Sequence, residues 1–419
     1  MKKSILLFAI ILTFSILTFA QSDSALKLVT EKDQTSRDGQ GNLLTLTVAE
    51  HLSRADVYMA NRHFPEAREH WQKVLDNYPS DTNARPKALF GIGRSLMWER
   101  QYQKAVDWFD KLLKDFAATK DGREGLAFKG ACLIRLGKNT EAAKTYEQYT
   151  IMFPFGEKIE SAFLNIIDAL REAKKYDEAN LWVEKAQSRF SGMPVATNAL
   201  HARLRMELFR QNWNEAVKTA DDLLLLKKFS DSMVTADEVK YLKGFALEKV
   251  GRKVDAIAAY SSIKDSISSY YGGLASEKLR QLSAGNQIQN TSSVSAKYVK
   301  DYPVVYRAEL LRAAKSLKID PRFVLAIMKQ ESSFRANAKS PSAARGLLQL
   351  VFDTALKYNK KAGYVSLKPD DLYLPSVNIA IGSVYIGELR DQFSGLYEAI
   401  AASYNGGEDN AARWLNRSK

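Results

Sequence analysis

Residues 320–349 read DPRFVLAIMKQESSFRANAKSPSAARGLLQ, and their first part predicts a helix. Asp320 can accept hydrogen bonds from first-turn amides, and Pro321 suits the first helical position. Phe323, Ile327 and Glu331 follow at steps of four, which places Glu331 on the apolar face of the helix. A half-buried carboxyl has a raised pKa, as a proton donor near neutral pH requires. Spacing alone leaves two interpretations open, a general acid or a helix-end glutamate that reaches solvent.

The chain begins with MKKSILLFAIILTFSILTFAQS, which has the layout of a secretory signal peptide over residues 1–20. We therefore expect an exported protein of the periplasm or cell envelope. The apolar run is too short for a stable membrane span, and no comparable stretch occurs later. Residues 21–47 are polar and show no clear period, so they are expected to form a tail.

The composition of the 419 residues is that of a globular protein with two or more domains. A formal net charge of +13 favours an anionic partner. In an exported protein we expect an envelope polymer or membrane surface and no nucleic acid, although the charge also fits a simple role in solubility. The single cysteine, Cys132, has no partner for an intramolecular disulfide and is expected to be a buried, inert thiol.

Residues 48–284 repeat a pattern of paired helices, which predicts an all-α chain with an N-terminal α-solenoid. Helices with small residues, such as GLAFKGACLIRLG, stand between the repeated ones. The recurring aromatic residues are predicted to be core residues, and the four histidines to be ordinary helix residues without metal spacing. The repeats are anchored by Ala67, Ala105, Ala142, Ala179, Ala216 and Ala256, and the aromatic stripe comprises Trp71, Trp108, Phe109, Tyr146, Trp182 and Tyr260.

A stretch rich in Ser, Asn and Gln at residues 285–300 is predicted to be a linker, and residues 301–419 a separate domain. The latter segment contains no histidine and no cysteine, which excludes Ser-His-Asp and Cys-His catalysis and the common zinc sites there. Glycine-rich phosphate loops are also missing from it. We therefore expect no metal and no cofactor, and chemistry that uses carboxylate, hydroxyl and amide groups.

Four motifs of this domain resemble, in order and spacing, those of the soluble lytic transglycosylases. They are Glu331-Ser332, GLLQ at 346–349, NIAIG at 378–382 with Tyr385, and ASYNGG at 402–407. Four ordered motifs are a specific pattern, whereas any one alone is weak. The resemblance implies a lysozyme-like, α-rich SLT domain, and the upstream helix pairs resemble tetratricopeptide repeats.

The family cleaves the β-1,4 bond between N-acetylmuramic acid and N-acetylglucosamine in peptidoglycan without water, leaving a 1,6-anhydromuramoyl end. The resemblance implies that Glu331 is the single catalytic acid, which later acts as the base. A hydrogen bond from Tyr404 is expected to hold Glu331. Partners are expected to be peptidoglycan strands and, through the helical repeats, other proteins. The substrate-binding residues that the resemblance implies are Ser332, Gly346, Gln349, Tyr404 and Asn405.

The chain departs from the family pattern beside its motifs. Ala343 stands where glycine is common, and Phe352 and Glu408 stand where proline is usual. The family also continues through a closing Ile-Pro and Glu-Thr-x-x-Tyr segment, so the domain is expected to be incomplete at its C-terminus. Two other functions fit the sequence: a hydrolytic lysozyme-like muramidase, and a non-catalytic repeat scaffold that binds peptidoglycan or proteins.

Overall fold

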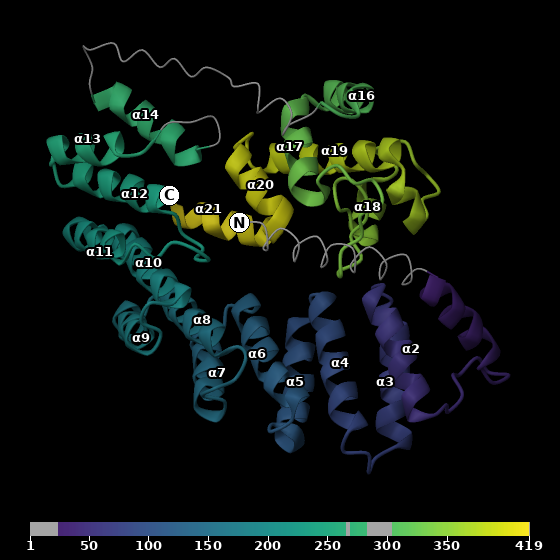
Figure 1. Ribbon diagram of the computed structural model, residues 1–419. Coiled ribbons are helices and arrows are strands. Elements are labelled where there is room, and N and C mark those ends of the chain that lie inside the picture. The colour runs from purple at the N-terminus through teal and green to yellow at the C-terminus, as the bar shows by residue number, and fades with distance from the viewer. Residues whose placement is uncertain (1–23, 265–268, 283–303, 419) are drawn as a thin grey trace, which may run out of the picture. The chain divides into compact units, whose positions relative to one another are not determined.

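The computed structural model describes residues 24–264, 269–282 and 304–418 (Figure 1). These residues form helices joined by turns, without any β-strand and with only three isolated β-bridges, so the prediction of a mainly α chain is confirmed. In these ranges no helix combines the length and apolarity that crossing a membrane requires. The predicted signal peptide (1–20) and linker (285–300) lie outside the described residues.

The chain divides into two compact units, one made of Met1–Tyr78 with Ser295–Lys419 and the other of Pro79–Val294. The second unit is a series of helices in which each packs on its neighbours in sequence (Figure 1). Its helices are α4 (Ala84–Trp98), α5 (Tyr102–Phe116), α6 (Lys120–Arg135), α7 (Asn139–Met152), α8 (Ile159–Glu172), α9 (Tyr176–Arg189), α10 (Pro194–Phe209), α11 (Trp213–Leu226), α12 (Ala236–Lys249), α13 (Lys253–Ser261) and α14 (Tyr270–Leu282).

The anchoring alanines of the repeats are fully buried, and most of the aromatic residues that follow them are buried as well. Gly130 of α6 shows why the intervening helices need small residues, since a Cβ there would lie 2.5 Å from the Tyr146 ring. Trp108 is the exception to the predicted core, because it is half-buried and the Lys111 ammonium lies 4.1 Å from its ring centroid. Cys132 is a free, buried cysteine, as predicted, and burial raises the pKa of its thiol to about 12.

The predicted polar tail is instead partly folded. Residues 24–35 are helical, and a bridge joins Arg37 to Leu43 before α2 (Val48–Ala60) and α3 (Phe64–Asn77). Asp33 is buried and accepts hydrogen bonds from Arg54 at 2.5 Å and Tyr58 at 2.7 Å. A polar segment is ordered here because its carboxylate meets donors that lie more than twenty residues later in the chain.

His51 and His70 are predicted to be ordinary helix residues, but both belong to the same buried network as Asp33. The Leu46 N–H donates to His51 Nε2 at 3.0 Å, His51 and His70 share a bond between their Nδ1 atoms at 2.9 Å, and His70 Nε2 meets Asp33 at 2.9 Å. Since His51 Nε2 is an acceptor, the protons must lie on His51 Nδ1 and His70 Nε2, and both rings are neutral. Burial lowers the pKa of His51 to about 4.

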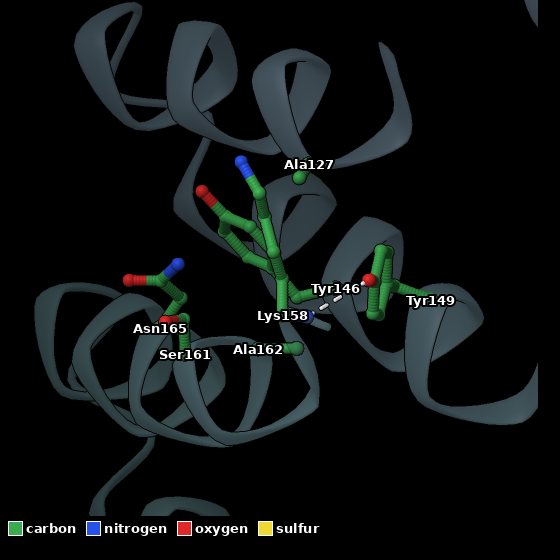
Figure 2. Close-up of a pocket in the computed structure, with 7 residues that line it drawn as sticks. All are labelled: Ala127, Tyr146, Tyr149, Lys158, Ser161, Ala162 and Asn165. Carbon is green, nitrogen blue, oxygen red and sulfur yellow. Dashed lines mark hydrogen bonds between the residues drawn. The ribbon is translucent and has the colours of Figure 1, made fainter. Parts of the chain in front are cut away.

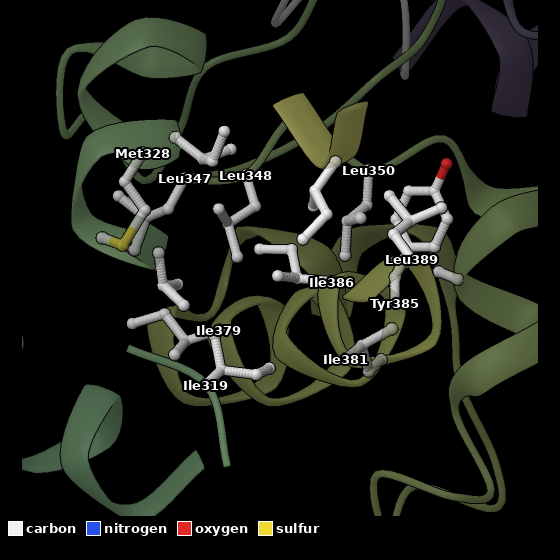
Figure 3. Close-up of a cluster of buried hydrophobic side chains, with 14 of the residues drawn as sticks. Ile319, Met328, Leu347, Leu348, Leu350, Ile379, Ile381, Tyr385, Ile386 and Leu389 are labelled. Carbon is white, nitrogen blue, oxygen red and sulfur yellow. The ribbon is translucent and has the colours of Figure 1, made fainter. Parts of the chain in front are cut away.

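The C-terminal part of the first unit is built around α19 (Pro375–Gln392), which packs against α16, α18, η1 and α20. Its residues 377–387, apart from Ala380, are buried on all sides of the helix, as expected for a helix in the centre of a domain. Figure 3 shows side chains of the surrounding core, including Met328, Leu347 and Leu348. The neighbouring elements are α16 (Arg307–Leu317), α17 (Pro321–Ser332), α18 (Phe352–Tyr358), the 3-10 helix η1 (Pro369–Tyr373), α20 (Tyr397–Gly406) and α21 (Glu408–Ser418).

Candidate functional site

Glu331 lies in the last turn of α17, on the helix that the sequence predicts. Asp320 caps the helix by accepting the Arg322 N–H at 2.9 Å, and Ile327, one turn before Glu331, is buried in the core. The carboxyl group is half-buried, and burial raises its pKa. No charged neighbour contributes to that shift, and no side chain in the described part of the chain hydrogen-bonds the carboxyl. Glu331 is therefore a lone, desolvated acid.

The backbone turns sharply directly after this helix. Ser333 and Phe334 have φ angles of +49° and +66°. Both angles lie in the left-handed region, which residues other than glycine rarely adopt. Such strain is common beside functional sites, where the surrounding packing maintains it. The sequence contains no glycine at either position that would have indicated this turn.

Ser332 is buried, and its hydroxyl donates to the Met328 carbonyl of the same helix at 3.1 Å. A serine within a helix commonly donates to the carbonyl four residues earlier in this way. The hydroxyl thus faces the interior of α17, and the predicted contact between Ser332 and substrate stays a prediction.

The GLLQ motif forms a compact loop, and α19 is bound to it through hydrogen bonds of the Asn378 side chain. Gly346 has φ +77°, and a Cβ there would lie 2.1 Å from the Leu372 carbonyl oxygen and 2.3 Å from the Asn378 amide nitrogen. The resemblance implies that Gly346 binds substrate, but the close approach that requires glycine here is to Leu372 and Asn378 of the protein itself. Asn378 is fully buried and donates to the Arg345 and Leu372 carbonyls at 2.9 and 2.8 Å.

Asn378 also accepts the Leu348 N–H at 2.8 Å. Its side chain therefore makes three buried hydrogen bonds, all to the backbone of the loop and of η1. The sequence places Asn378 in the NIAIG motif, but an asparagine within an apolar helix gives no indication of the loop that it holds.

Gln349 lies at the end of this loop in a half-buried position with φ +45°. Its amide nitrogen donates to the Ala338 carbonyl at 3.1 Å and to the Gly346 carbonyl at 2.9 Å. Both amide protons are thus used, and among the described residues none donates to its side-chain oxygen. That oxygen is available as an acceptor for an N–H or O–H group of a ligand.

Tyr404 of α20 connects the loop to the acid. Its hydroxyl donates to the Leu348 carbonyl at 2.6 Å, so its proton is not given to Glu331 as we had expected. Burial raises the pKa of Tyr404 well above its usual value, and the charge of nearby Glu331 adds to this effect. Tyr404 thus contacts Leu348, the residue that precedes Gln349, and lies near Glu331, while Asn405 next to it is exposed.

The three residues that depart from the family pattern, Ala343, Phe352 and Glu408, lie at turns or at the first residue of a helix. Ala343 is buried with φ +58°, a conformation that favours glycine. Phe352 begins α18, and Glu408 begins α21 and accepts a hydrogen bond from Tyr385 at 3.2 Å. The Tyr385 ring lies 5.3 Å from that of Tyr404, measured between centroids, so Glu408 is linked to the site through two tyrosines.

Elsewhere in the described chain we find a small pocket in the repeats and no cluster of metal-binding side chains. Over residues 24–264, 269–282 and 304–418, no group of three or more His, Cys, Asp and Glu side chains is arranged to hold a metal ion. A small pocket of about 30 Å³ lies in the repeats (Figure 2) and has room for about one water molecule. It is lined by Ala127, Tyr146, Tyr149, Lys158, Ser161, Ala162 and Asn165.

Comparison with known proteins finds a family match in each of two segments of the chain. Residues 310–419 match the family model for the transglycosylase SLT domain, and residues 52–122 match a tetratricopeptide repeat. A soluble lytic murein transglycosylase of Escherichia coli (strain K12) is 32% identical over 120 residues, which are 28% of this chain and 18% of that protein. The match thus spans less than a fifth of the length of that relative.

A membrane-bound lytic murein transglycosylase C of Glaesserella parasuis is 27% identical over 237 residues, 54% of this chain and 62% of that protein. Among solved structures, a complex of the 70-kDa soluble lytic transglycosylase with bulgecin A aligns with 89% of this chain and 67% of its own, at 18% identity and a TM-score of 0.48. The chain therefore carries a transglycosylase SLT domain together with tetratricopeptide repeats, and its relatives are lytic murein transglycosylases.

Proposed function

We propose that the chain is a lytic transglycosylase that cleaves the β-1,4 bond between N-acetylmuramic acid and N-acetylglucosamine in peptidoglycan. The observation that carries the proposal is the state of Glu331, a lone carboxyl whose pKa burial raises, within an SLT domain. Glycosidases that use water or a protein nucleophile need two carboxylates, one on each side of the bond. A single acid without a charged neighbour fits a reaction in which the substrate supplies the nucleophile.

In the proposed mechanism Glu331 acts twice. The protonated carboxyl donates its proton to the glycosidic oxygen as the bond from that oxygen to C1 of the muramoyl sugar breaks, and the leaving sugar departs with a new hydroxyl. The resulting carboxylate then accepts the proton of the C6 hydroxyl as the C6 oxygen bonds to C1. The product is a 1,6-anhydro ring, and the acid returns to its protonated form. Assistance by the N-acetyl group of the substrate replaces the second carboxylate.

The neighbouring residues receive binding roles in this proposal. The side-chain oxygen of Gln349 is available to accept a hydrogen bond from a sugar N–H or O–H group, since both amide protons are used internally. Tyr404 forms one wall beside Glu331, and the exposed Asn405 extends that wall toward solvent. Gly346 and Ser332 act through the backbone that they shape, because their contacts are internal.

Digestion of purified peptidoglycan sacculi, followed by mass spectrometry of the fragments, tests the proposal. We expect fragments with 1,6-anhydromuramoyl ends from the wild-type chain and none from Glu331→Gln, which keeps the shape of the side chain. Fragments with only reducing ends would indicate the muramidase. If the wild type and Glu331→Gln both bind sacculi and neither cleaves them, the chain is a scaffold.

We further propose that the protein works in the cell envelope, where its helical repeats contact glycan strands or partner proteins. The substrate requires this location, and the murein enzymes among its relatives support it. Fractionation of cells that express the chain with a C-terminal tag tests the location. Recovery in the cytoplasmic fraction alone would contradict it.

A further inference from the structure

The turn between α2 and α3 contacts the loop that carries Gln349. Asn61 caps α2, and its side-chain amide donates to the Val57 carbonyl at 2.9 Å. Its side-chain oxygen accepts a hydrogen bond from the Lys339 ammonium at 3.0 Å, and both residues are buried. The next residue in the turn, Arg62, pairs with Asp353 at 3.1 Å. Two consecutive residues of the first helical hairpin therefore hold the SLT domain.

The two residues that are held, Lys339 and Asp353, flank the loop on either side. Lys339 forms a β-bridge with Arg345. The carbonyl of Ala338, next to Lys339, accepts the Gly346 N–H at 2.8 Å and the Gln349 amide at 3.1 Å. Any displacement of Lys339 therefore moves the carbonyl that orients the Gln349 side chain.

We infer that Asn61 is a positioning residue for the SLT domain, which holds Lys339 and, through the Ala338 carbonyl, fixes the orientation of Gln349. A buried ammonium group requires hydrogen-bond acceptors, because its desolvation is otherwise uncompensated. Asn61 supplies one from a segment 278 residues away in the sequence. The consequence for catalysis rests on the proposed function, whereas the mechanical coupling does not.

The two contacts should differ in strength. The Asn61–Lys339 bond is buried, whereas the Asp353 side chain is 62% exposed, and exposed ion pairs contribute little. Removal of the Asn61 acceptor is therefore the informative change. Asn77 offers a matched control, since it ends α3, donates to the Lys73 carbonyl at 3.0 Å in the same way, and is exposed.

Hydrogen exchange of the full chain, followed by mass spectrometry, tests the coupling. In Asn61→Leu we expect amides of residues 338–350 to exchange about tenfold faster, the factor that loss of one buried hydrogen bond produces. Asn77→Leu should leave this segment as in the wild type. Lys339→Met should speed exchange there as well, and adding it to Asn61→Leu should add little, because the two residues share one bond. Unchanged exchange of residues 338–350 in Asn61→Leu would overturn the inference.

Cleavage kinetics on purified glycan strands provide the second measurement. Asn61→Leu should raise KM about tenfold with a smaller effect on kcat, because Gln349 is proposed to bind substrate rather than transfer protons. Asn61→Asp, which keeps an acceptor for Lys339, should restore most of the affinity. If the wild type cleaves nothing, the proposed function fails while the exchange result still decides the coupling. If the wild type is active and KM stays unchanged in Asn61→Leu, the catalytic part of the inference is wrong.

Discussion

Replacement of Gly346 by alanine should destabilise the SLT domain far more than its backbone angle alone explains. Gly346 has φ +77°, and a Cβ there would lie 2.1 Å from the Leu372 carbonyl oxygen and 2.3 Å from the Asn378 amide nitrogen. Gly395 has nearly the same angle, φ +79°, but a Cβ there would meet nothing within 4 Å. The pair therefore separates the cost of the contacts from the cost of the backbone conformation.

The expected difference follows from the contacts. A left-handed alanine costs about 1–2 kcal/mol at either position, and this cost cancels in the comparison. At Gly346 the new methyl group must also displace the Leu372 carbonyl or the Asn378 amide, which breaks their 2.8 Å hydrogen bond inside the core. A buried group left without its partner costs about 1–3 kcal/mol, and overpacking a similar amount. We expect Gly346→Ala to cost about 2–6 kcal/mol more than Gly395→Ala.

Native-state hydrogen exchange of α19 in the full chain measures this difference, because α19 lies beneath the loop and reports unfolding of the domain that contains it. Exchange rates of peptides within residues 375–392 are compared for the wild type and both variants. A difference below about 0.5 kcal/mol between Gly346→Ala and Gly395→Ala would show that the contacts at Gly346 add no cost, since that is the usual scatter of additivity for independent sites.

Three further outcomes are expected. Ala343→Gly should raise the free energy of unfolding by about 0.5–1 kcal/mol in thermal denaturation, because it removes the strain of φ +58° at the expense of some chain entropy. Glu331→Gln should leave stability at pH 7 unchanged or raise it in urea unfolding, since a carboxyl whose pKa folding raises destabilises the fold above its unfolded pKa. Imidazole protons of His51 and His70, followed by NMR, should not titrate near pH 6.5, because burial lowers both pKa values.

The contribution of His51 to the free energy of unfolding depends on pH in a defined direction. The pKa of His51 is about 4 in the fold and 6.5 in its absence, so its contribution is fully present above pH 6.5 and is lost as the pH falls toward 4. The full effect is up to about 3 kcal/mol. Asp33, Arg54 and Lys73 also face this ring, and the two cations oppose its protonation. Titration of His51 near pH 6.5 would contradict the proton positions assigned to the two histidines. For the other two variants, Glu331→Gln and Ala343→Gly, a loss of stability relative to the wild type would contradict the prediction.

Much of the scaffold could be predicted because its cause is local. Asp320 and Pro321 start α17, steps of four place Glu331 beside the core, and both features are visible in twelve residues. The buried alanines of the repeats, such as Ala105 and Ala142, follow from a periodic pattern that every unit shares. Such elements are determined by short-range patterns of polarity and size.

What could not be predicted depends on partners far away in the sequence. Asp33 looks like a residue of a polar tail until His70 is placed 2.9 Å from it. Asn378 looks like a polar interruption in an apolar helix, although it makes three bonds to the loop and η1. The Tyr404 hydroxyl donates to a backbone carbonyl, and because every residue has a backbone carbonyl, the sequence does not indicate which one accepts the bond. Side-chain bonds to distant backbone groups are therefore the part that only the structure reveals.

We propose that Glu331 is a lone acid that cleaves glycan strands without water. Digestion of sacculi in water enriched in oxygen-18, followed by mass spectrometry of the new ends, tests it most directly. We predict 1,6-anhydromuramoyl ends that contain no oxygen-18, formed by the wild-type chain and not by Glu331→Gln. Reducing ends labelled with oxygen-18 would show that the chain is a hydrolase, and equal cleavage by Glu331→Gln would show that Glu331 is not the catalytic acid.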